Sequence, residues 1–456
     1  MADESFDVIV IGAGPGGYVA AIRAAQLGKT TAVVEADKSG GRCLNYACIP
    51  AKTMLHTAEV FDEAQNSAGI GVKVQGAELD WEALGQRRTD VSASLSGGVK
   101  GLFDKNKIKY IEGRGSLTAD GDVKVGDTVY GAGKVILATG SVAQPIPGVE
   151  FSDRVLDTWG AWSLPERPQK IAVVGAGASG SEIASAYIRF GTEVILVEML
   201  DQILPLEDKD VVRVVDRTFK KQGIEVSTGT PVENVEVGDS SVKFNYGENS
   251  AEVDYLVIAG GRRPDVEGLG LDEAGVKLDD DGRVQVDEHQ KTSNDKVYAI
   301  GDLVRGAALA HKAMEEGVVA AEHASGAETH PVDLDLIPGA TFCHPQVASV
   351  GLTEAKAKEK GLDVKTGKLK LGGVGAGTVY DDKDGMVKLV VDKEYGEIVG
   401  AHIVGNRACD MIAELVAVMA LEGGIQELQR IMHPHPTISE AILDAARAVD
   451  KWATHA

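Results

Sequence analysis

The feature that most limits the fold of this chain is an internal duplication. An apolar stretch at 6–11 is followed by a glycine-rich turn that begins at Gly12, a helical pattern, and a second apolar stretch that ends on Glu35. The same plan returns between 171 and 198, with Gly175 and Glu198 at the corresponding places and with equal spacing from glycine to acid. A repeated strand–helix–strand unit is typical of α/β folds with parallel sheets. The sequence therefore predicts two α/β domains of one kind.

The two glycine turns indicate a binding chemistry as well as a fold. One such turn alone can be a tight strand-to-helix connection without a ligand. Here both turns precede a helix and an acid, a pattern in which backbone amides approach a pyrophosphate and the acid binds ribose hydroxyls. Glu198 would repel a 2′-phosphate, and Met199 and Leu200 supply no arginine, so NAD is predicted over NADP. The turn residues are Gly12, Gly14, Pro15 and Gly17 in the first copy and Gly175, Gly177 and Gly180 in the second.

The length of the chain and its other strand signals predict further parts. At 456 residues the chain is too long for one hydrophobic core, and about three domains are expected. Two more strand-to-turn signatures end at 140 and 261, and the proline-containing stretch at 144–148 is typical of a linker. A strand at 297–302 precedes a helical pattern from about 308 to 324. From 337 onward, strand patterns, an amphipathic helix near 408–422 and a histidine-rich turn indicate an α+β domain.

The charge and the cysteine content exclude several classes of protein. The chain has 46 Lys and Arg against 69 Asp and Glu, a net charge of −23, whereas nucleic-acid binding needs clustered cations. The acidic surface is interpreted as a solubility feature or, alternatively, as a docking face for a basic partner. No apolar run reaches the length of a membrane span, and the first residues lack a signal-peptide pattern, so no membrane association is expected. Four cysteines are too few for a disulfide framework, which favours the cytoplasm.

Cys43 and Cys48 follow the first duplicated unit closely. A zinc site would need further ligands and usually a shorter spacing, so no metal is expected, and a redox disulfide is favoured over two inert core cysteines. One helical turn would bring the two sulfurs together, and a helix start near 49–50 would lower the thiol pKa of Cys48. Cys343 and Cys409 lack this context and are interpreted as buried or incidental.

The turn at 433–437 contains His433 and His435 between prolines, and Glu440 follows it. One interpretation is a proline-stiffened turn with solvent-facing histidines. The other is a general base held by a carboxylate, which fixes the imidazole tautomer and raises its basicity. Thiol chemistry needs such a base, because an unperturbed thiol is mostly protonated at neutral pH.

From residue 6 to the carboxyl end, the chain resembles the flavoprotein disulfide reductases, and among them the members that oxidise dihydrolipoamide. The most specific motifs are Cys-Leu-Asn-x-x-Cys-Ile-Pro from Cys43 and His-x-His-Pro-Thr-x-Ser-Glu from His433. Further segments that carry the resemblance lie at 12–17, 40–52, 175–182, 261–264, 299–302, 309–313 and 337–351.

The resemblance implies the roles of individual residues. Cys48 would lie next to the flavin and Cys43 would exchange with the substrate, while Lys52 would lie near the flavin and pair with Glu182. His435, held by Glu440, would be the base and would come from the other subunit. The residues implied for FAD are Gly12, Gly14, Pro15, Gly17, Glu35, Gly41, Arg42, Lys52, Gly115, Thr139, Gly140, Ser141, Asp302, Leu309, Ala310 and His311. Those implied for NAD are Gly175, Gly177, Gly180, Glu182, Glu198, Val232 and Gly261.

The resemblance also implies the architecture and the partners. Residues 1–145 and 269–336 would bind FAD, 146–268 would bind NAD, and 337–456 would form the interface of a homodimer. The substrate would be dihydrolipoamide on a lipoyl domain, and the partner would be the acyltransferase core of a 2-oxo acid dehydrogenase complex, or else the glycine cleavage system. The chain departs from the family pattern at Arg42, where threonine is usual, and at 373–378, where a polar stretch is usual.

Three alternatives compete with this prediction. A glutathione-type reductase would need a clamp for NADPH in place of Glu198, and a mercuric reductase would need cysteines near the carboxyl end, where this chain has none. A non-catalytic flavoprotein scaffold is the alternative from another class. It would have no use for a complete set of two cysteines, a histidine and a glutamate.

Overall fold

The computed structural model describes residues 4–455, and the chain forms two compact units. The first unit combines the amino-terminal segment up to Thr53 with Glu82–Gln144 and Gly261–Val332. The second combines Met54–Trp81, Pro145–Gly260 and the segment from Asp333 onward. The break after Gln144 falls in the proline-containing stretch at 144–148. Among the helices of residues 4–455, none is long and apolar enough to cross a membrane.

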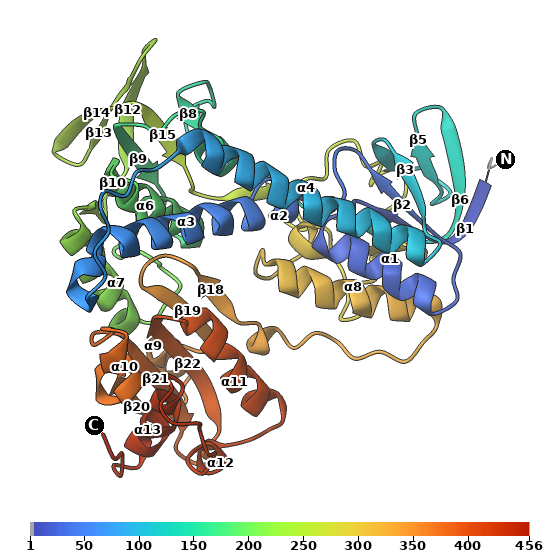
Figure 1. Ribbon diagram of the computed structural model, residues 1–456. Helices are drawn as coiled ribbons and strands as arrows, with labels where there is room; N and C mark the ends of the chain where they lie inside the picture. The colour runs from blue at the N-terminus through green and yellow to red at the C-terminus, as the bar shows by residue number, and fades with distance from the viewer. Residues whose placement is uncertain (1–3, 456) are drawn as a thin grey trace. The chain divides into compact units, whose positions relative to one another are not determined.

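The first unit is built on a seven-stranded sheet with the order β3-β2-β1-β6-β5-β4 and with β17 beside β6 (Figure 1). Its central strands β1 (Glu4–Ile11), β2 (Thr31–Glu35), β3 (Lys109–Glu112), β6 (Thr128–Leu137) and β17 (Val297–Ala299) run parallel. The short strands β4 (Gly115–Leu117) and β5 (Val123–Val125) complete the sheet in antiparallel pairing. The predicted strand at 297–302 ends earlier, because Gly301–Leu303 form a 3-10 turn.

Helices α1 (Pro15–Gln26) and α8 (Ala310–Ser325) lie side by side in this unit (Figure 1). Glycines permit their close approach. A Cβ on Gly317 would lie 2.5 Å from the carbonyl oxygen of Gly16, and a Cβ on Gly16 would lie 2.6 Å from that of Ala313. Both distances are too short for a carbon atom, so larger residues would push the two helices apart. The helix predicted at about 308–324 is therefore confirmed, and its position depends on two glycines.

The second unit repeats the plan with a five-stranded parallel sheet of order β11-β10-β9-β15-β8. The strands are β8 (Val155–Leu156), β9 (Lys170–Val174), β10 (Glu193–Val197), β11 (Glu225–Ser227) and β15 (Tyr255–Ile258). Helix α6 (Ala178–Arg189) joins β9 to β10, and α7 (Lys209–Gln222) precedes β11. A three-stranded antiparallel sheet, β12 (Val232–Val237), β13 (Val242–Tyr246) and β14 (Asn249–Val253), comes next. The predicted duplication is thus confirmed.

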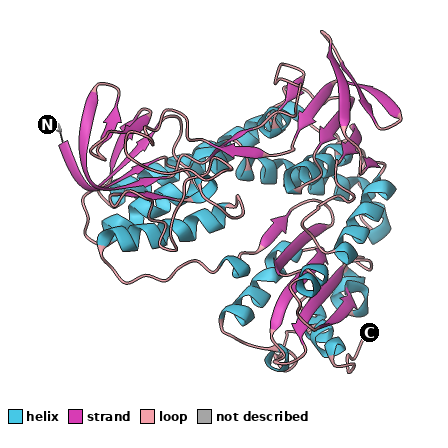
Figure 2. Cartoon of the chain, turned by 180° about the vertical axis from the view of Figure 1, so that it is seen from behind, coloured by secondary structure: helices cyan, strands magenta, loops and turns pink. Residues whose placement is uncertain are grey.

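The carboxyl-terminal part of the second unit is the expected α+β fold. Its antiparallel sheet has the order β18-β19-β22-β21-β20, and helices α11 (Ala408–Ala420) and α13 (Glu440–Val449) pack on it (Figure 2). The strands are β18 (Gly339–Thr341), β19 (Gln346–Gly351), β20 (Val364–Lys370), β21 (Met386–Asp392) and β22 (Ile398–Gly405). Fully buried Leu389, Ile403 and Leu415 belong to the core between sheet and helices. The segment at 373–378, which departs from the family pattern, forms most of the short helix α10 (Gly375–Val379).

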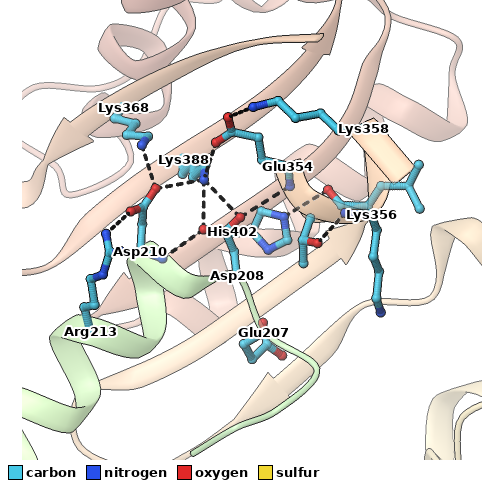
Figure 3. Close-up of polar contacts among 12 residues, drawn as sticks. Glu207, Asp208, Asp210, Arg213, Glu354, Lys356, Lys358, Lys368, Lys388 and His402 are labelled. Carbon is cyan, nitrogen blue, oxygen red and sulfur yellow. Dashed lines mark hydrogen bonds and ion pairs between the residues drawn. The ribbon is translucent and has the colours of Figure 1, made fainter. Parts of the chain in front are cut away.

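A buried lysine connects α7 to this sheet, and we call its group the Lys388 cluster. The Nζ atom of Lys388 in β21 lies 2.9 Å from Asp208, 2.8 Å from Asp210 and 2.9 Å from Glu354, which belongs to α9 (Glu354–Glu359) (Figure 3). An ammonium has three donors, so each carboxylate receives one. Burial raises the pKa of Asp210, but hydrogen bonds from Lys368 and Lys388 outweigh burial and lower it to about 2.

Candidate functional site

Steric limits that only glycine satisfies shape the first glycine turn. Gly12 has a φ of 104°, and a Cβ on Gly17 would lie 1.9 Å from the carbonyl oxygen of Gly12. Gly14 is the N-cap of α1 and offers no side-chain cap, and no heavy atom of the described chain lies within 4 Å of where its Cβ would be. Pro15 opens the helix, where its missing N–H costs nothing. The first amides of α1 therefore remain available to an anion.

Glu35, the last residue of β2, accepts backbone hydrogen bonds at both carboxylate oxygens, and one of them holds this turn. Its Oε2 accepts a hydrogen bond from the amide of Ala13 at 2.7 Å, and its Oε1 accepts one from the amide of Asp37 at 2.8 Å. Burial raises the pKa of Glu35, and the two amides offset only part of that rise. Gly115 opens β4 next to Val34 and Ile11, at the ends of the two strands that carry the turn.

The two cysteines lie on short elements beside the same turn. Cys43 belongs to α2 (Gly41–Asn45), together with Arg42, and α3 (Cys48–Asn66) begins at Cys48. A Cβ on Gly41 would lie 2.5 Å from the Cα of Gly14, so α2 begins directly against the first glycine turn. The expectation that one helical turn joins the cysteines is wrong in detail, because Tyr46 leaves helical geometry with a φ of −138° and ends α2.

The two thiols have different environments. A hydrogen bond with Cys48 is the largest cause that raises the pKa of Cys43, burial adds to the rise, and the charge of Lys52 lowers it in part. Cys48 is the first residue of a 19-residue helix, where the helix dipole favours a negative charge. Lys52 follows one turn later on the same helix. The helix start favours Cys48 as the thiolate of the pair.

A polar group completes the first unit's candidate site. Ser141, at the start of β7 (Ser141–Ala143), donates to Oδ2 of Asp302 at 2.5 Å, and Nε of Arg262 donates to the Ser141 hydroxyl at 2.8 Å. Arg262 also donates to the Ser141 carbonyl. The hydroxyl of Thr139 donates to the carbonyl of Asp265 at 2.7 Å. Gly140, between Thr139 and Ser141, has a φ of 78°. Leu309 is the N-cap of α8, and Ala310 and His311 form its first turn.

Two residues near Asp302 were not singled out in the sequence. Lys312 and Glu316 form an ion pair of 2.7 Å with side chains that are 0% and 2% exposed. Glu316 also accepts from the amide of Gly301 at 2.7 Å, so this pair fixes the turn that carries Asp302. The four-residue spacing of Lys312 and Glu316 on a helix was the available signal, and it is too common at surfaces to indicate burial.

The second glycine turn repeats the geometry of the first. Gly175 has a φ of 96°, Gly177 is an N-cap with no described heavy atom near its missing Cβ, and a Cβ on Gly180 would lie 1.9 Å from the Gly175 carbonyl oxygen. Glu198 accepts from the amide of Ala176 at 2.7 Å and from that of Leu200 at 2.9 Å. Val232 opens β12. Gly261 follows the end of β15 with a φ of 150°.

Glu182 is buried on α6 in the second unit, and its Oε1 accepts from the amide of Phe342 at 2.9 Å. Ser185, one turn later, accepts from the amide of His344 at 2.8 Å. Glu182 therefore holds α6 to the segment between β18 and β19. Lys52 belongs to the first unit and Glu182 to the second, so their pairing stays a prediction.

The histidine turn presents one exposed and one buried imidazole. The side chain of His435 is 76% exposed, and its Nδ1 lies 2.8 Å from Oε1 of Glu440. Burial raises the pKa of Glu440, but hydrogen bonds with His435 and the amide of Thr437 outweigh burial and lower it. His433 is buried, with Nε2 2.7 Å from Glu414, and this contact raises the pKa of His433. Both histidines therefore have a carboxylate partner, and only His435 is accessible to a substrate.

These arrangements fit two dinucleotides. Each glycine turn leaves an uncapped helix start with room for a pyrophosphate, and each acid keeps lone pairs for ribose hydroxyls. Helix α2, which carries Cys43, begins against the first turn. This combination suits a redox cofactor that exchanges electrons with thiols at the first turn and a diffusible nucleotide at the second.

Comparisons with known proteins agree with this geometry. The family described as pyridine nucleotide-disulphide oxidoreductase matches residues 6–317, and its dimerisation domain matches residues 337–446. A mitochondrial dihydrolipoyl dehydrogenase of Pisum sativum is 39% identical over 98% of this chain and 92% of the relative. A dihydrolipoyl dehydrogenase of Staphylococcus aureus is 40% identical over 98% of this chain and 97% of the relative.

A solved structure is also similar along the whole chain. The HOCl-induced flavoprotein disulfide reductase RclA of Escherichia coli, solved as a Cu(II) complex, superimposes with a TM-score of 0.88. The two sequences are 26% identical, and the match covers 97% of this chain and 99% of that protein. The similarity therefore includes both glycine turns and the carboxyl-terminal α+β fold.

Proposed function

The chain belongs to the pyridine nucleotide-disulphide oxidoreductase family, and from that premise we propose that it catalyses the NAD-dependent oxidation of dihydrolipoamide, the activity for which its relatives are named. It is an oxidoreductase that uses FAD and NAD, and residues 337–446 are a dimerisation domain, so it works as a homodimer. The observation that carries the proposal is the Cys43–Cys48 pair, since α2, which carries Cys43, begins directly against the first glycine turn.

The asymmetry of the thiols supports an order of events. In the oxidised enzyme Cys43 and Cys48 form a disulfide, and a thiolate of dihydrolipoamide attacks the sulfur of Cys43. The S–S bond breaks, a mixed disulfide forms, and Cys48 leaves as the thiolate that the start of α3 stabilises. The second substrate sulfur then attacks the mixed disulfide, which releases lipoamide and leaves two reduced cysteines. Bound FAD supplies the route by which this electron pair reaches NAD as a hydride.

His435 is suited to take the thiol protons of the substrate. Its Nδ1 bonds Glu440, which leaves Nε2 to accept a proton, and the exposed ring can reach a second molecule. We assign the base for each dithiol to His435 of the partner subunit, since the family's dimerisation domain carries this turn. The acyltransferase core of a 2-oxo acid dehydrogenase complex is the proposed docking partner, and the cytoplasm is the proposed location.

A steady-state assay tests the activity directly. The FAD-loaded homodimer should reduce NAD with dihydrolipoamide. It should be at least tenfold less efficient with NADP, because the carboxylate of Glu198, in the role proposed for it, would repel a 2′-phosphate. Glutathione disulfide with NADPH is the parallel arm. Turnover in that arm without turnover of dihydrolipoamide would contradict the proposed substrate, and a flavin that reacts with neither substrate would favour the scaffold.

The origin of the base is tested with mixed dimers. A chain with Cys48→Ser and a chain with His435→Ala should each form a nearly inactive homodimer. When the two are coexpressed, one site of each mixed dimer carries both substitutions and the other carries neither. Random pairing makes half of the dimers mixed, so roughly a quarter of the wild-type activity should return. If histidine and cysteines came from one chain, every site would carry a lesion and no activity would return.

A further inference from the structure

A pocket in the second unit is lined by none of the residues of the candidate redox site. It has a volume of about 860 Å³ and lies between the last turns of α6 and α7 and the residues around Phe61 in α3. All of its lining residues belong to the second unit. The second glycine turn is at the start of α6 and the pocket is at its end, roughly 16 Å along the helix axis. The pocket is therefore distinct from the place predicted for NAD.

Arg189 is the unusual feature of this pocket. The residue is 9% exposed, and its Nε donates to the carbonyl of Ser185 at 2.9 Å, which accounts for one of its five N–H donors. Its two terminal nitrogens have no hydrogen-bond or ion-pair partner within residues 4–455. Burial lowers the pKa of Arg189, and the charges of Asp62 and Glu59 raise it in part. These nitrogens are not among the fully buried atoms that lack a partner, so they are open to the pocket that Arg189 lines, and an anion there would meet donors that the chain leaves unused.

The obvious internal partner for Arg189 is already engaged. Oδ1 of Asp62 accepts a hydrogen bond from the side-chain amide of Asn66 at 2.9 Å, and no ion pair of 4 Å or less joins Asp62 to Arg189. Two further cations lie on the pocket wall. Lys221 in the last turn of α7 is exposed, and Arg167 donates to the carbonyl of Gly191 at 2.6 Å.

A second unused group lies in the same wall. Oε1 of Gln222, the last residue of α7, is buried and has no hydrogen-bond partner in the described part of the chain. An amide oxygen accepts hydrogen bonds and cannot donate them. Rotation of the Gln222 amide would turn this oxygen from the protein interior to the pocket, where a hydroxyl could donate to it. The pocket therefore has unused donors for an anionic group at Arg189 and an unused acceptor for a hydrogen-bond donor at Gln222.

We propose that this pocket binds a small organic anion that carries a hydroxyl group, with the anionic group on Arg189 and Lys221 and the hydroxyl on Gln222. A bidentate contact to a guanidinium accepts either a carboxylate or a phosphate. The shared chemistry is thus an oxyanion next to a polyol chain, and it can come from a sugar acid or from a sugar phosphate.

Calorimetric titration of the FAD-loaded homodimer tests the site with four probes. Glycerol 3-phosphate and glycerate carry both features, inorganic phosphate lacks the hydroxyls, and glycerol lacks the anion. At least one of the first two should bind once per chain with a Kd near or below about 1 mM. Binding of glycerol 3-phosphate would indicate a sugar phosphate as the natural ligand, and binding of glycerate would indicate a sugar acid. Inorganic phosphate should bind more weakly and glycerol not at all. Absence of binding by both hydroxylated anions would overturn the proposal.

Substitutions locate the binding. Arg189→Gln should weaken it about tenfold or more, because a charge-assisted contact is lost. Lys221→Gln should weaken it less, and Asp62→Asn should strengthen it by removal of a nearby negative charge. Lys220→Gln is the matched control, since this exposed lysine on the same helix pairs with Asp216 and does not line the pocket. If Arg189→Gln does not fold, Lys221→Gln and Asp62→Asn still decide. Equal affinities across Lys221→Gln, Asp62→Asn and Lys220→Gln would place the anion elsewhere and overturn the assignment.

Discussion

The two glycine turns of this chain are nearly identical, but the segments beyond them serve different purposes. In both turns the alanine after the first glycine accepts a hydrogen bond of 2.8 Å at its carbonyl from an amide later in the chain. The amide of Gly40 donates to Ala13 in the first turn, and the amide of Leu204 donates to Ala176 in the second. Both donors have left-handed backbones, with φ of 83° and 46°. The chain returns to the turn in the same way in each copy.

The two copies differ beyond this return bond. After Gly40 the chain enters α2, which begins against the turn and carries Cys43, and then α3, which begins at Cys48. After Leu204 it enters α7 through Asp208, which belongs to the Lys388 cluster. The chain thus leads from the first glycine turn to the two cysteines, and from the second glycine turn to a structural ion cluster. The glycine turn therefore provides the backbone geometry for binding, while the residues that follow Gly40 or Leu204 determine what each copy does with it.

The largest expected effect tests the reactive side of the comparison. Cys48→Ser should lower dihydrolipoamide-dependent reduction of NAD by about a thousandfold or more, because the chain can no longer form the Cys43–Cys48 disulfide that the substrate reduces. Flavin content and NADH binding should stay unchanged. Cys409→Ser is the control and should stay within about twofold, as this cysteine lies far along the chain in α11 and contacts the carbonyls of Thr341 and Val347. Comparable losses in both variants would contradict the assignment of Cys48.

The next effect tests the structural side. Lys388→Met should destabilise the protein by about 3–5 kcal/mol in urea unfolding, because three carboxylates would lose their shared cation in a buried place. Lys368→Met is matched to it, since Lys368 contacts the same Asp210 at 2.6 Å but is 42% exposed, and its loss should cost no more than about 1 kcal/mol. Similar costs would mean that burial does not distinguish the two lysines.

A pair of glycine substitutions should separate the two cofactor sites. Gly17→Ala and Gly180→Ala each place a Cβ 1.9 Å from a carbonyl oxygen, which should cost about 1–3 kcal/mol or more. Gly17→Ala should reduce the FAD content of the purified protein, and Gly180→Ala should keep FAD and raise the KM for NAD. Gly14→Ala and Gly177→Ala are controls for the free energy of unfolding alone, because no described atom beyond the chain neighbours blocks a Cβ there and the fold should tolerate them. If Gly17→Ala kept full flavin occupancy, the first turn would not be the FAD site.

The smallest expected effect concerns the acids that end the second strands. Glu198→Arg should move the ratio of efficiencies with NADP and NAD by about tenfold toward NADP, because a cation replaces a carboxylate near the ribose. Glu35→Gln, at the equivalent place in the first copy, should leave this ratio unchanged. A shift of equal size in both variants would show that the ratio responds to general loosening of the turns.

Local signals made the duplicated fold predictable. Glycines at fixed spacing, apolar strands and a terminal acid act within about 25 residues, and each has a steric or polar cause that is visible in the sequence. The cysteine pair and the histidine turn were identified for the same reason. The break at Tyr46 was not predicted, because the spacing of Cys43 and Cys48 suits both one helical turn and two helices.

Contacts between distant parts of the chain could not be predicted. Lys388 meets Asp208 across 180 positions, and nothing near Lys388 except its place in an apolar strand marks it as special. The contacts of Arg262 with Ser141 and of Lys312 with Glu316 were missed for the same reason, since the partners of a charged residue are known only after the elements pack. The unused donors of Arg189 likewise become visible only when every neighbour has been placed.

The double role that we propose for Glu198, at the nucleotide and in the turn, would constrain how a protein of this kind changes its nucleotide. Its carboxylate receives the amides of Ala176 and Leu200, so a substitution that admits a 2′-phosphate also removes two acceptors from the turn. A lineage that moves from NAD to NADP at this position would first have to acquire another acceptor for those amides, or lose rigidity in the intermediate. The order of mutations would therefore be restricted. A change of coenzyme at Glu198 would also weaken the backbone of the turn, because the same side chain supports it.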